Sequence, residues 1–227
     1  MLPPGQREID HFPRFGTHLH QPPPTVPAEP WLEVGGAVTQ SFVLPLGDLT
    51  AMPRREMLAD FHCVAGWSVS GLRWEGVPFD AFHRDVLAPR ADGTITHVKF
   101  IGMDGHWSVA LLEDLCANDV LLAERLNGQP LDGDHGAPLR LVSPAQYGFI
   151  NTKHLCRIEL LTTEPATCIG SASSPAHLGL RLFGYKRFVR ARVWRQERHR
   201  FLPPHVVKEI SRLLIPGIRR VSGRPPG

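Results

Sequence analysis

The sequence of 227 residues contains only four cysteines, and no two of them stand at the C-x-x-C spacing that zinc sites and redox motifs use. They are Cys63, Cys116, Cys156 and Cys168. A disulfide framework and a structural zinc site are therefore not expected. We interpret Cys116, Cys156 and Cys168 as small core residues and assign them no chemistry.

No apolar run in the sequence approaches the roughly 20 residues that a membrane-spanning helix needs. The first residues, Met1 to Glu8, contain neither the apolar stretch of a secretory signal nor a twin-arginine motif. We therefore expect a soluble, cytoplasmic protein without a membrane span.

Neither sign of charge dominates the chain, whose formal net charge is +3. Hydrophobic residues make up 42% and charged residues 21%, which excludes a disordered or fibrous class. The charge is uneven, because the residues from Arg181 onward carry 13 Lys and Arg but only two acids. The sequence thus predicts an acidic body with a basic C-terminal tail that docks on it. An acidic electron-transfer partner and nucleic acid are the alternative partners, since the tail mixes basic and aromatic residues.

Long helices are not expected either, because 22 prolines and 21 glycines interrupt the chain. The prediction is a strand-rich α+β fold with short helices in three parts: a proline-rich arm at 1–30 lying on the body, a main domain at 31–165, and a linker with the basic tail at 166–227. Strands are expected at 31–34, 41–44, 96–101, 139–142 and 156–162, and short helices at 45–51, 78–87 and 111–117. Asn127-Gly128 predicts a hairpin turn.

One cysteine stands in a segment that carries more information. The stretch Phe61-His62-Cys63-Val64-Ala65-Gly66-Trp67-Ser68, followed by Trp74-Glu75-Gly76-Val77-Pro78-Phe79, resembles the metal-ligand segment of the sulfite-oxidase-like molybdopterin oxidoreductases. By itself, a lone cysteine between apolar residues is a small buried hydrophobe. The resemblance implies instead that the Cys63 thiolate binds molybdenum beside two dithiolene sulfurs of a pterin, a soft ligand for a thiophilic metal.

Two further segments, 135–144 and 147–158, resemble the loops with which this family grips the pterin and its phosphate. In isolation they would be a hairpin and a turn with surface cations. Arginine offers a planar fork of donors to phosphate oxygens, and lysine adds a point charge. The cofactor-binding residues that the resemblance implies are His135, Arg140, Asn151, Thr152 and Lys153, with Phe15 and Gly102 added from weaker correspondences.

The substrate side differs from that of true sulfite oxidases. These enzymes have an arginine close after the metal cysteine, where this chain has Gly66-Trp67-Ser68. We therefore expect sulfite to be a poor substrate, and the chain resembles more closely the branch of the methionine-sulfoxide reductases. The expected pocket residues are Trp67, Arg73, Trp74 and Tyr147, with Arg73 either folding back as a cation or stacking at the surface.

The resemblance implies a sulfite-oxidase-type fold that holds molybdenum and molybdopterin in its mononucleotide-free form. The predicted activity is two-electron oxygen-atom transfer on a small S- or N-oxide, with Cys63 as the catalytic metal ligand and an unidentified electron-transfer partner. We expect a monomer. The alternative is a non-catalytic binding protein whose basic tail contacts nucleic acid or an acidic partner. The pair His18 and His20 is interpreted as surface histidines and not as a metal site.

Overall fold

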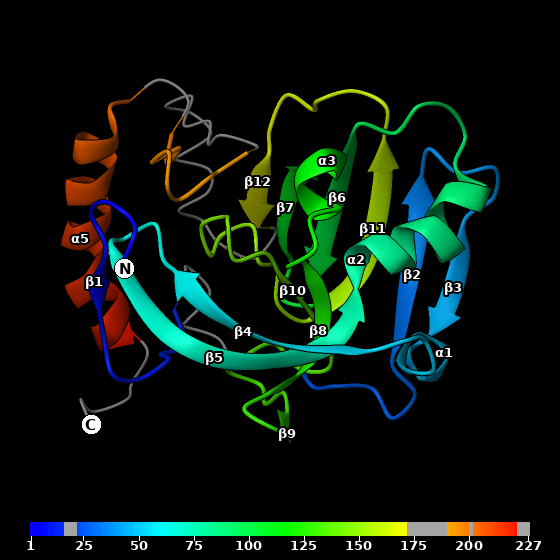
Figure 1. Ribbon diagram of the computed structural model, residues 1–227, viewed down its shortest axis with the longest axis horizontal. Helices are drawn as coiled ribbons and strands as arrows, with labels where there is room; N and C mark the ends of the chain where they lie inside the picture. The colour runs from blue at the N-terminus through cyan, green and yellow to red at the C-terminus, as the bar shows by residue number, and fades with distance from the viewer. Residues whose placement is uncertain (16–21, 172–189, 200–201, 222–227) are drawn as a thin grey trace.

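The computed structural model describes residues 1–15, 22–171, 190–199 and 202–221, which form two packed β-sheets with helices around them (Figure 1). The first sheet has the strand order β1-β5-β8-β10, with β4 also paired to β5 and β9 to β8. The second sheet has the order β12-β7-β6-β11-β2-β3. The strand-rich α+β class predicted from the sequence is thus confirmed.

The first sheet contains β1 (Arg7–Glu8), β4 (Arg55–His62), β5 (Trp67–Pro78), β8 (Leu121–Leu126), β9 (Gln129–Pro130) and β10 (Arg140–Val142). The second contains β2 (Trp31–Gly36), β3 (Phe42–Pro45), β6 (His97–Gly102), β7 (His106–Leu111), β11 (Leu155–Leu161) and β12 (Ile169–Ser171). The helices are α1 (Leu46–Thr50), α2 (Phe79–Phe82), the π-helical turn η1 (His83–Leu87), the 3₁₀ turn η2 (Ala88–Arg90), α3 (Leu112–Leu115) and α5 (Pro204–Val221).

The 12-residue strand β5 organises the first sheet, because it pairs with β1, β4 and β8. Its side chains alternate near the middle, where Leu72 and Trp74 are buried and Arg73 between them is exposed. Gly76 is needed where β5 meets β8, since a Cβ there would lie 2.1 Å from the Leu122 carbonyl oxygen. This strand and the turn before it position the site described below.

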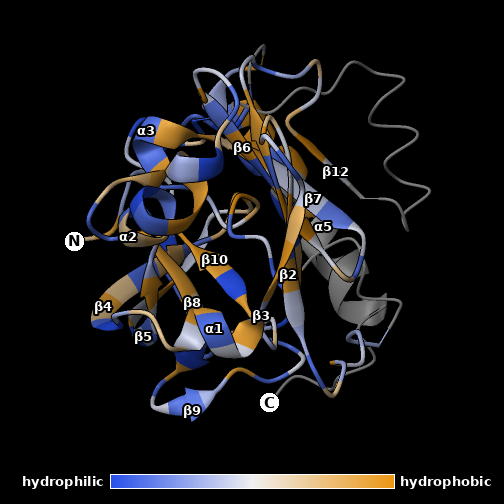
Figure 2. Ribbon diagram, turned by 90° about the vertical axis from the view of Figure 1, so that its right-hand side faces the viewer, coloured by the Kyte–Doolittle hydropathy of each residue, from blue (hydrophilic) through white to orange (hydrophobic). Residues whose placement is uncertain are grey.

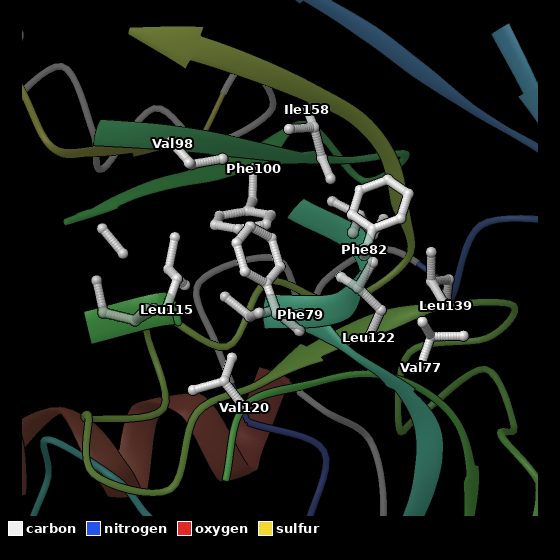
Figure 3. Packing of buried hydrophobic residues seen from close by; sticks show 14 of the residues in the cluster. Val77, Phe79, Phe82, Val98, Phe100, Leu115, Val120, Leu122, Leu139 and Ile158 are labelled. Carbon is white, nitrogen blue, oxygen red and sulfur yellow. The ribbon is translucent and has the colours of Figure 1, made fainter. Parts of the chain in front are cut away.

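The main core lies between the two sheets and includes Phe79 and Phe82 of α2, Phe100 of β6 and Ile158 of β11 (Figure 3). These four side chains are fully buried, and the Phe79 and Phe100 rings meet edge to face with centroids 5.8 Å apart. Truncating such a ring costs about 3–5 kcal/mol of stability. Figure 2 shows the sheets as two layers, with hydrophobic stretches on β2, β6, β8 and β10. This core fixes the first sheet against the second.

Most of the elements predicted between residues 31 and 162 are present within two residues of their expected ends. Asn127 and Gly128 form the β8–β9 turn with φ of 52° and 79°. The strands β1, β4, β5, β7 and β12 and the 18-residue helix α5 were not predicted. Glycines interrupt the hydrophobic pattern of β5, and α5 lies in a proline-containing basic tail that gave no helical expectation.

The N-terminal arm and part of the tail pack onto the body. Strand β1 runs parallel to β5, and the Arg7 N–H donates to the Gly66 carbonyl at 3.0 Å. In the tail, Ala191 and Val193 belong to the main core, and Arg192 pairs with Asp114 at 2.5 Å. The small-residue linker predicted before the tail falls largely outside the described residues. In the part of the chain that the structure describes, no helix is both long enough and apolar enough to span a membrane.

Candidate functional site

Cys63 opens the tight turn that joins β4 to β5. The turn closes through two hydrogen bonds, from the Cys63 N–H to the Trp67 carbonyl at 2.8 Å and from the Gly66 N–H to the Cys63 carbonyl at 3.0 Å. Gly66 has a φ of 92°, and a Cβ there would lie 3.0 Å from the Gly5 carbonyl oxygen, which favours glycine. The Cys63 side chain is a buried thiol, and the Ala65 N–H points at its sulfur at 3.5 Å. The sequence therefore folds into a turn that fixes one thiol in place.

A chain of side-chain hydrogen bonds ties this turn to the N-terminal arm. Gln6 donates from Nε2 to the Cys63 carbonyl at 3.1 Å and accepts from the Ser68 hydroxyl at 3.0 Å. The same hydroxyl lies 2.7 Å from Nδ1 of His62. Burial lowers the pKa of His62, so its ring is neutral in this chain of bonds. Because Ser68 and His62 are buried, these bonds restrict the orientation of the turn. Gln6 was not singled out from the sequence.

Aromatic side chains surround the turn and join it to the rest of the site. Phe61 and Trp67 lie 5.6 Å apart between ring centroids, and Phe12 lies 4.8 Å from Phe61 and 6.0 Å from Trp74. Phe15 meets Trp67 edge to face at 5.5 Å. Cys63, Trp67 and Trp74 belong to one apolar cluster against which Phe12, Phe15 and Phe61 pack. The predicted residues Phe15, Trp67 and Trp74 are thus close to Cys63.

Arg140 of β10 is a charged side chain inside this aromatic cluster. Its residue is 1% exposed, and its guanidinium carbon lies 4.9 Å from the Trp74 ring centroid, 5.7 Å from that of Phe61 and 5.8 Å from that of Phe12. It donates to the His135 carbonyl at 2.9 Å but forms no ion pair with a described residue. Burial lowers its pKa to about 9. A buried arginine without a counter-ion is costly and calls for an anionic ligand.

Lys153 adds a second cation at the same place. Gly136 lies between the side chains of Lys153 and Arg140, since a Cβ on it would be 3.0 Å from the Lys153 Cβ and 3.2 Å from the Arg140 Cβ. The Lys153 ammonium donates to the Asp134 carbonyl at 3.1 Å. Burial lowers the pKa of Lys153 to about 7, and the charge of Arg140 acts in the same direction. Two poorly solvated cations side by side form an anion site.

The shifted pKa of Lys153 predicts how the stability of the cofactor-free protein varies with pH. Between about pH 7 and 10.5, the ordinary pKa of a lysine, the unfolded chain holds a proton on Lys153 that the folded protein has released. The free energy of unfolding should therefore rise with pH across this window and lose this contribution as pH falls through 7. Urea denaturation of wild type and Lys153→Gln from pH 7 to 9.5 measures it. Parallel curves for the two proteins would contradict the shift.

His135 contacts both the N-terminal arm and Arg140 of the anion site. Its Nδ1 lies 2.7 Å from Asp132, and its Nε2 lies 3.0 Å from the Phe12 carbonyl oxygen. The ring also packs on Phe12, with centroids 5.0 Å apart. His135 therefore lies beside Arg140, as predicted, and its carbonyl oxygen accepts the Arg140 hydrogen bond.

Three other predicted residues shape the site by holding its loops in place, and the side chains of Asn151 and Thr152 are already engaged in hydrogen bonds. The Asn151 amide bonds to both backbone groups of Ser143, and the Thr152 hydroxyl lies 2.8 Å from that of Ser108. Gly102 allows the backbone of Lys153 to approach, because a Cβ there would be 2.3 Å from the Lys153 carbonyl oxygen. These residues shape the loop that carries Lys153.

Of the two readings of Arg73, the structure agrees with the surface position and corrects the one in which it folds back toward Cys63 as a pocket cation. It lies on the exposed side of β5, with Nε 3.9 Å from a Glu56 carboxylate oxygen. The reason is the strand alternation, which turns Trp74 inward and Arg73 outward. Tyr147, by contrast, is fully buried, and the charge of Cys63 contributes to the rise of its pKa after the larger effect of burial.

A basic residue that sequence reasoning missed also lies near Cys63. Arg198, in the described part of the tail, is fully buried and donates from Nη1 to the Val64 carbonyl oxygen. The excess of basic residues in the tail was the available signal, but it did not distinguish this arginine from its neighbours. His18 and His20 lie outside the described residues. Among the described residues, no group of three or more His, Cys, Asp and Glu side chains could hold a metal ion.

The residues present fit a phosphate-bearing cofactor with a metal that takes a thiolate. Arg140 and Lys153 supply buried positive charge, and Gly136 leaves room beside both of them. Cys63 supplies one soft ligand, and the metal would take its remaining ligands from the cofactor, because no carboxylate–histidine cluster stands among the described residues. Arg140 and Lys153, here called the phosphate grip, are separate from the Cys63 thiol, and the aromatic cluster connects them.

Comparison with known proteins finds the same chemistry. Residues 20–169 match the family described as oxidoreductase molybdopterin binding domain. The uncharacterized oxidoreductase YuiH of Bacillus subtilis is 35% identical over 161 residues, covering 70% of this chain and 78% of YuiH. The protein-methionine-sulfoxide reductase catalytic subunit MsrP of Ralstonia nicotianae is 30% identical over 178 residues, covering 70% of this chain and 53% of MsrP.

Two further comparisons extend this result. Mitochondrial sulfite oxidase of Rattus norvegicus is 32% identical over 183 residues, covering 67% of this chain but 33% of that protein. The crystal structure of the sulfane dehydrogenase SoxCD from Paracoccus pantotrophus aligns with a TM-score of 0.51 at 23% identity, over 59% of this chain and 38% of that one. This likeness shows a shared fold. The chain spans about half or less of the matched methionine-sulfoxide reductase and sulfite oxidase.

Proposed function

Because the chain belongs to the oxidoreductase molybdopterin binding domain family, we propose that it catalyses two-electron oxygen-atom transfer on a small S- or N-oxide. The observation that carries the proposal is the buried pair Arg140 and Lys153, placed with Cys63 around one aromatic cluster. The names of two relatives, a methionine-sulfoxide reductase and a sulfite oxidase, both describe chemistry at a sulfur–oxygen bond. A binding protein without activity would not need a thiol and two buried cations in one site.

Each group has a distinct task in this proposal. Arg140 and Lys153 bind the phosphate of molybdopterin, and their low solvation makes the interaction strong. Cys63 is the protein's ligand to molybdenum, held in orientation by the turn and by Gln6. When bound, the cofactor supplies the two-electron redox chemistry. Trp67 and Trp74, each less than 5% exposed, exclude water from the region around the thiol.

The electron-transfer partner belongs to the proposal as well, because two-electron chemistry on an oxide needs a donor or an acceptor of electrons. The acidic body and basic tail offer surfaces of both signs for such a partner. The cytoplasmic location and the monomeric state stay predictions.

Cofactor content tests the proposal directly. Protein purified from a host that makes molybdopterin should contain about one molybdenum per chain, and its denatured extract should give the fluorescence of oxidised pterin without a nucleotide. Elemental analysis and pterin fluorescence measure this. Protein from that host without metal and without pterin would contradict the enzyme assignment and favour the binding protein with a basic tail.

A further inference from the structure

Helix α5 lies at one end of the molecule, beside β1 and the Cys63 turn (Figure 1). Its Val207 side chain is fully buried against the body. The stem of Lys208 lies over the turn, since a Cβ on Gly66 would be 3.7 Å from the Lys208 Cε and Cγ. The helix lies beyond residues 20–169, which the family match covers. One side of α5 is therefore packed next to the site.

Another side of α5 presents apolar side chains to solvent. Ile210 is 42% exposed and Leu213 is 79% exposed, and a spacing of three residues puts both on one face of the helix. Leu202, just before the helix, is exposed as well. Among the described large apolar residues, only Met1 at the chain end is more exposed than Leu213. Apolar side chains that gather on one exposed face indicate a binding surface.

Positive charge accompanies this apolar face. The sequence of α5 contains four Lys and Arg but one acid, Glu209. Arg212 is exposed, and its ion pair with Glu209 at 3.3 Å contributes little because both side chains are in water. The residues before Arg181 carry 12 Lys and Arg against 20 acids. An anionic surface therefore attracts the end of the molecule that carries α5 and repels the rest, which selects one orientation.

We propose that α5 binds the protein to the surface of an anionic lipid bilayer, with Ile210 and Leu213 inserted among the acyl chains and Arg212 at the headgroups. A helix with an apolar face and basic flanks lies in the plane of such a surface. Its affinity comes from buried apolar area together with attraction to anionic lipid. Because α5 contacts the Cys63 turn, this binding holds the turn roughly 10 Å, one helix diameter, from the lipid.

Two other occupants fit the same face less well. A second copy of the chain would bring two basic helices together, and like charges across an interface are unfavourable. An acidic protein would need a groove shaped for Ile210 and Leu213, whereas a bilayer accepts apolar side chains without a matching shape. Binding to lipid needs neither molybdenum nor turnover, so the inference is independent of the proposed function.

Co-sedimentation of the full chain with vesicles of phosphatidylcholine and about 30% phosphatidylglycerol tests the proposal. Binding to phosphatidylcholine alone should be at least about tenfold weaker, and about 0.5 M salt should weaken binding to the mixed vesicles to a similar extent. Ile210→Ser/Leu213→Ser should reduce the affinity for the mixed vesicles at least about tenfold, and Arg212→Gln should reduce it about fivefold. All three positions are exposed, so the fold is unaffected.

Two control proteins carry the same kinds of change away from α5. Val43→Ser/Leu58→Ser removes two apolar side chains that are 58% and 74% exposed on strands. Arg84→Gln removes an exposed cation that pairs with a neighbouring acid, Asp85. Both controls should bind like wild type. Wild type that ignores the mixed vesicles or binds both vesicle types equally, or an equal loss in a control and its α5 counterpart, would overturn the proposal.

A tryptophan in place of Leu213 gives a second readout that does not depend on affinity. The emission of Leu213→Trp protein should shift to shorter wavelength on the mixed vesicles and be quenched by lipids with brominated acyl chains, whereas Leu58→Trp should show neither effect. If Ile210→Ser/Leu213→Ser instead abolishes self-association in light scattering, or retention on immobilised polyglutamate without vesicle binding, the lipid assignment is wrong. Vesicle binding by protein that takes up no molybdenum would retain this inference and refute the enzyme. Active, molybdenum-loaded protein that does not bind vesicles would do the reverse.

Discussion

Cys63→Ser protein is expected to lose oxygen-atom transfer by at least about a hundredfold while retaining most of its pterin. The hydroxyl of serine stays largely protonated and is a harder and weaker donor than a thiolate, so the metal would lose the ligand that sets its electron density. Arg140 and Lys153 act on the phosphate and are untouched by the change. Steady-state turnover, together with molybdenum and pterin content of the same preparation, measures both effects.

The other cysteines provide controls of equal chemical size. Cys116, Cys156 and Cys168 are thiols outside the aromatic cluster, and burial raises the pKa of Cys116 and of Cys156. Their serine variants should lose about 1 kcal/mol of stability or little more and keep turnover. Turnover by Cys63→Ser near the wild-type rate, or an equal loss in one of the controls, would remove Cys63 from its place as metal ligand.

Arg140→Met is expected to reduce cofactor content at least about tenfold while leaving the cofactor-free protein as stable as wild type or more so. Methionine keeps much of the side chain's buried volume among Trp74, Phe61 and Phe12 but carries no charge. Removing an unpaired buried charge relieves a desolvation cost of several kcal/mol, so folding does not suffer. Pterin fluorescence per chain and urea denaturation of the cofactor-free protein give the two quantities.

Arg125→Met is the matched control for this change, because Arg125 lies on the neighbouring strand β8 and pairs with Glu75 at 3.3 Å. Its loss should leave cofactor content unchanged. An Arg140→Met protein that keeps its pterin, or that loses it only because the chain unfolds, would show that Arg140 is a structural residue and not part of the phosphate grip.

The features predicted best from the sequence depend on short stretches of chain. The Asn127-Gly128 hairpin follows from two residues that tolerate positive φ, and the resemblance that singled out Cys63 rests on a contiguous segment. Strand β5 was harder, because two glycines interrupt its pattern: Gly71 has a positive φ of 68°, and Gly76 allows the close approach of β8. The sequence pattern of a short stretch therefore predicts a turn or strand only where that stretch alone determines the backbone geometry.

The site depends on contacts between residues far apart in the sequence, which the spacing of residues within a motif cannot predict. Arg140 is buried by aromatic residues from the arm, β4 and β5, which are distant in sequence and meet around it in the folded chain. Both readings of Arg73 stayed open because no strand was predicted there, and the alternation of β5 is what turns it outward. Arg198 reaches Val64 from 134 residues away, and Gln6 reaches Cys63 from 57 residues away. Contacts of that separation depend on the topology of both ends of the chain.

The number of sulfur atoms around molybdenum in wild-type and Cys63→Ser protein tests most directly whether Cys63 is the metal ligand. X-ray absorption at the molybdenum edge counts these neighbours without relying on a substrate. If Cys63 holds the metal, molybdenum in the variant has one sulfur neighbour fewer than in the wild type, with the pterin content preserved. Equal sulfur counts in the two proteins would contradict the claim that Cys63 holds the metal.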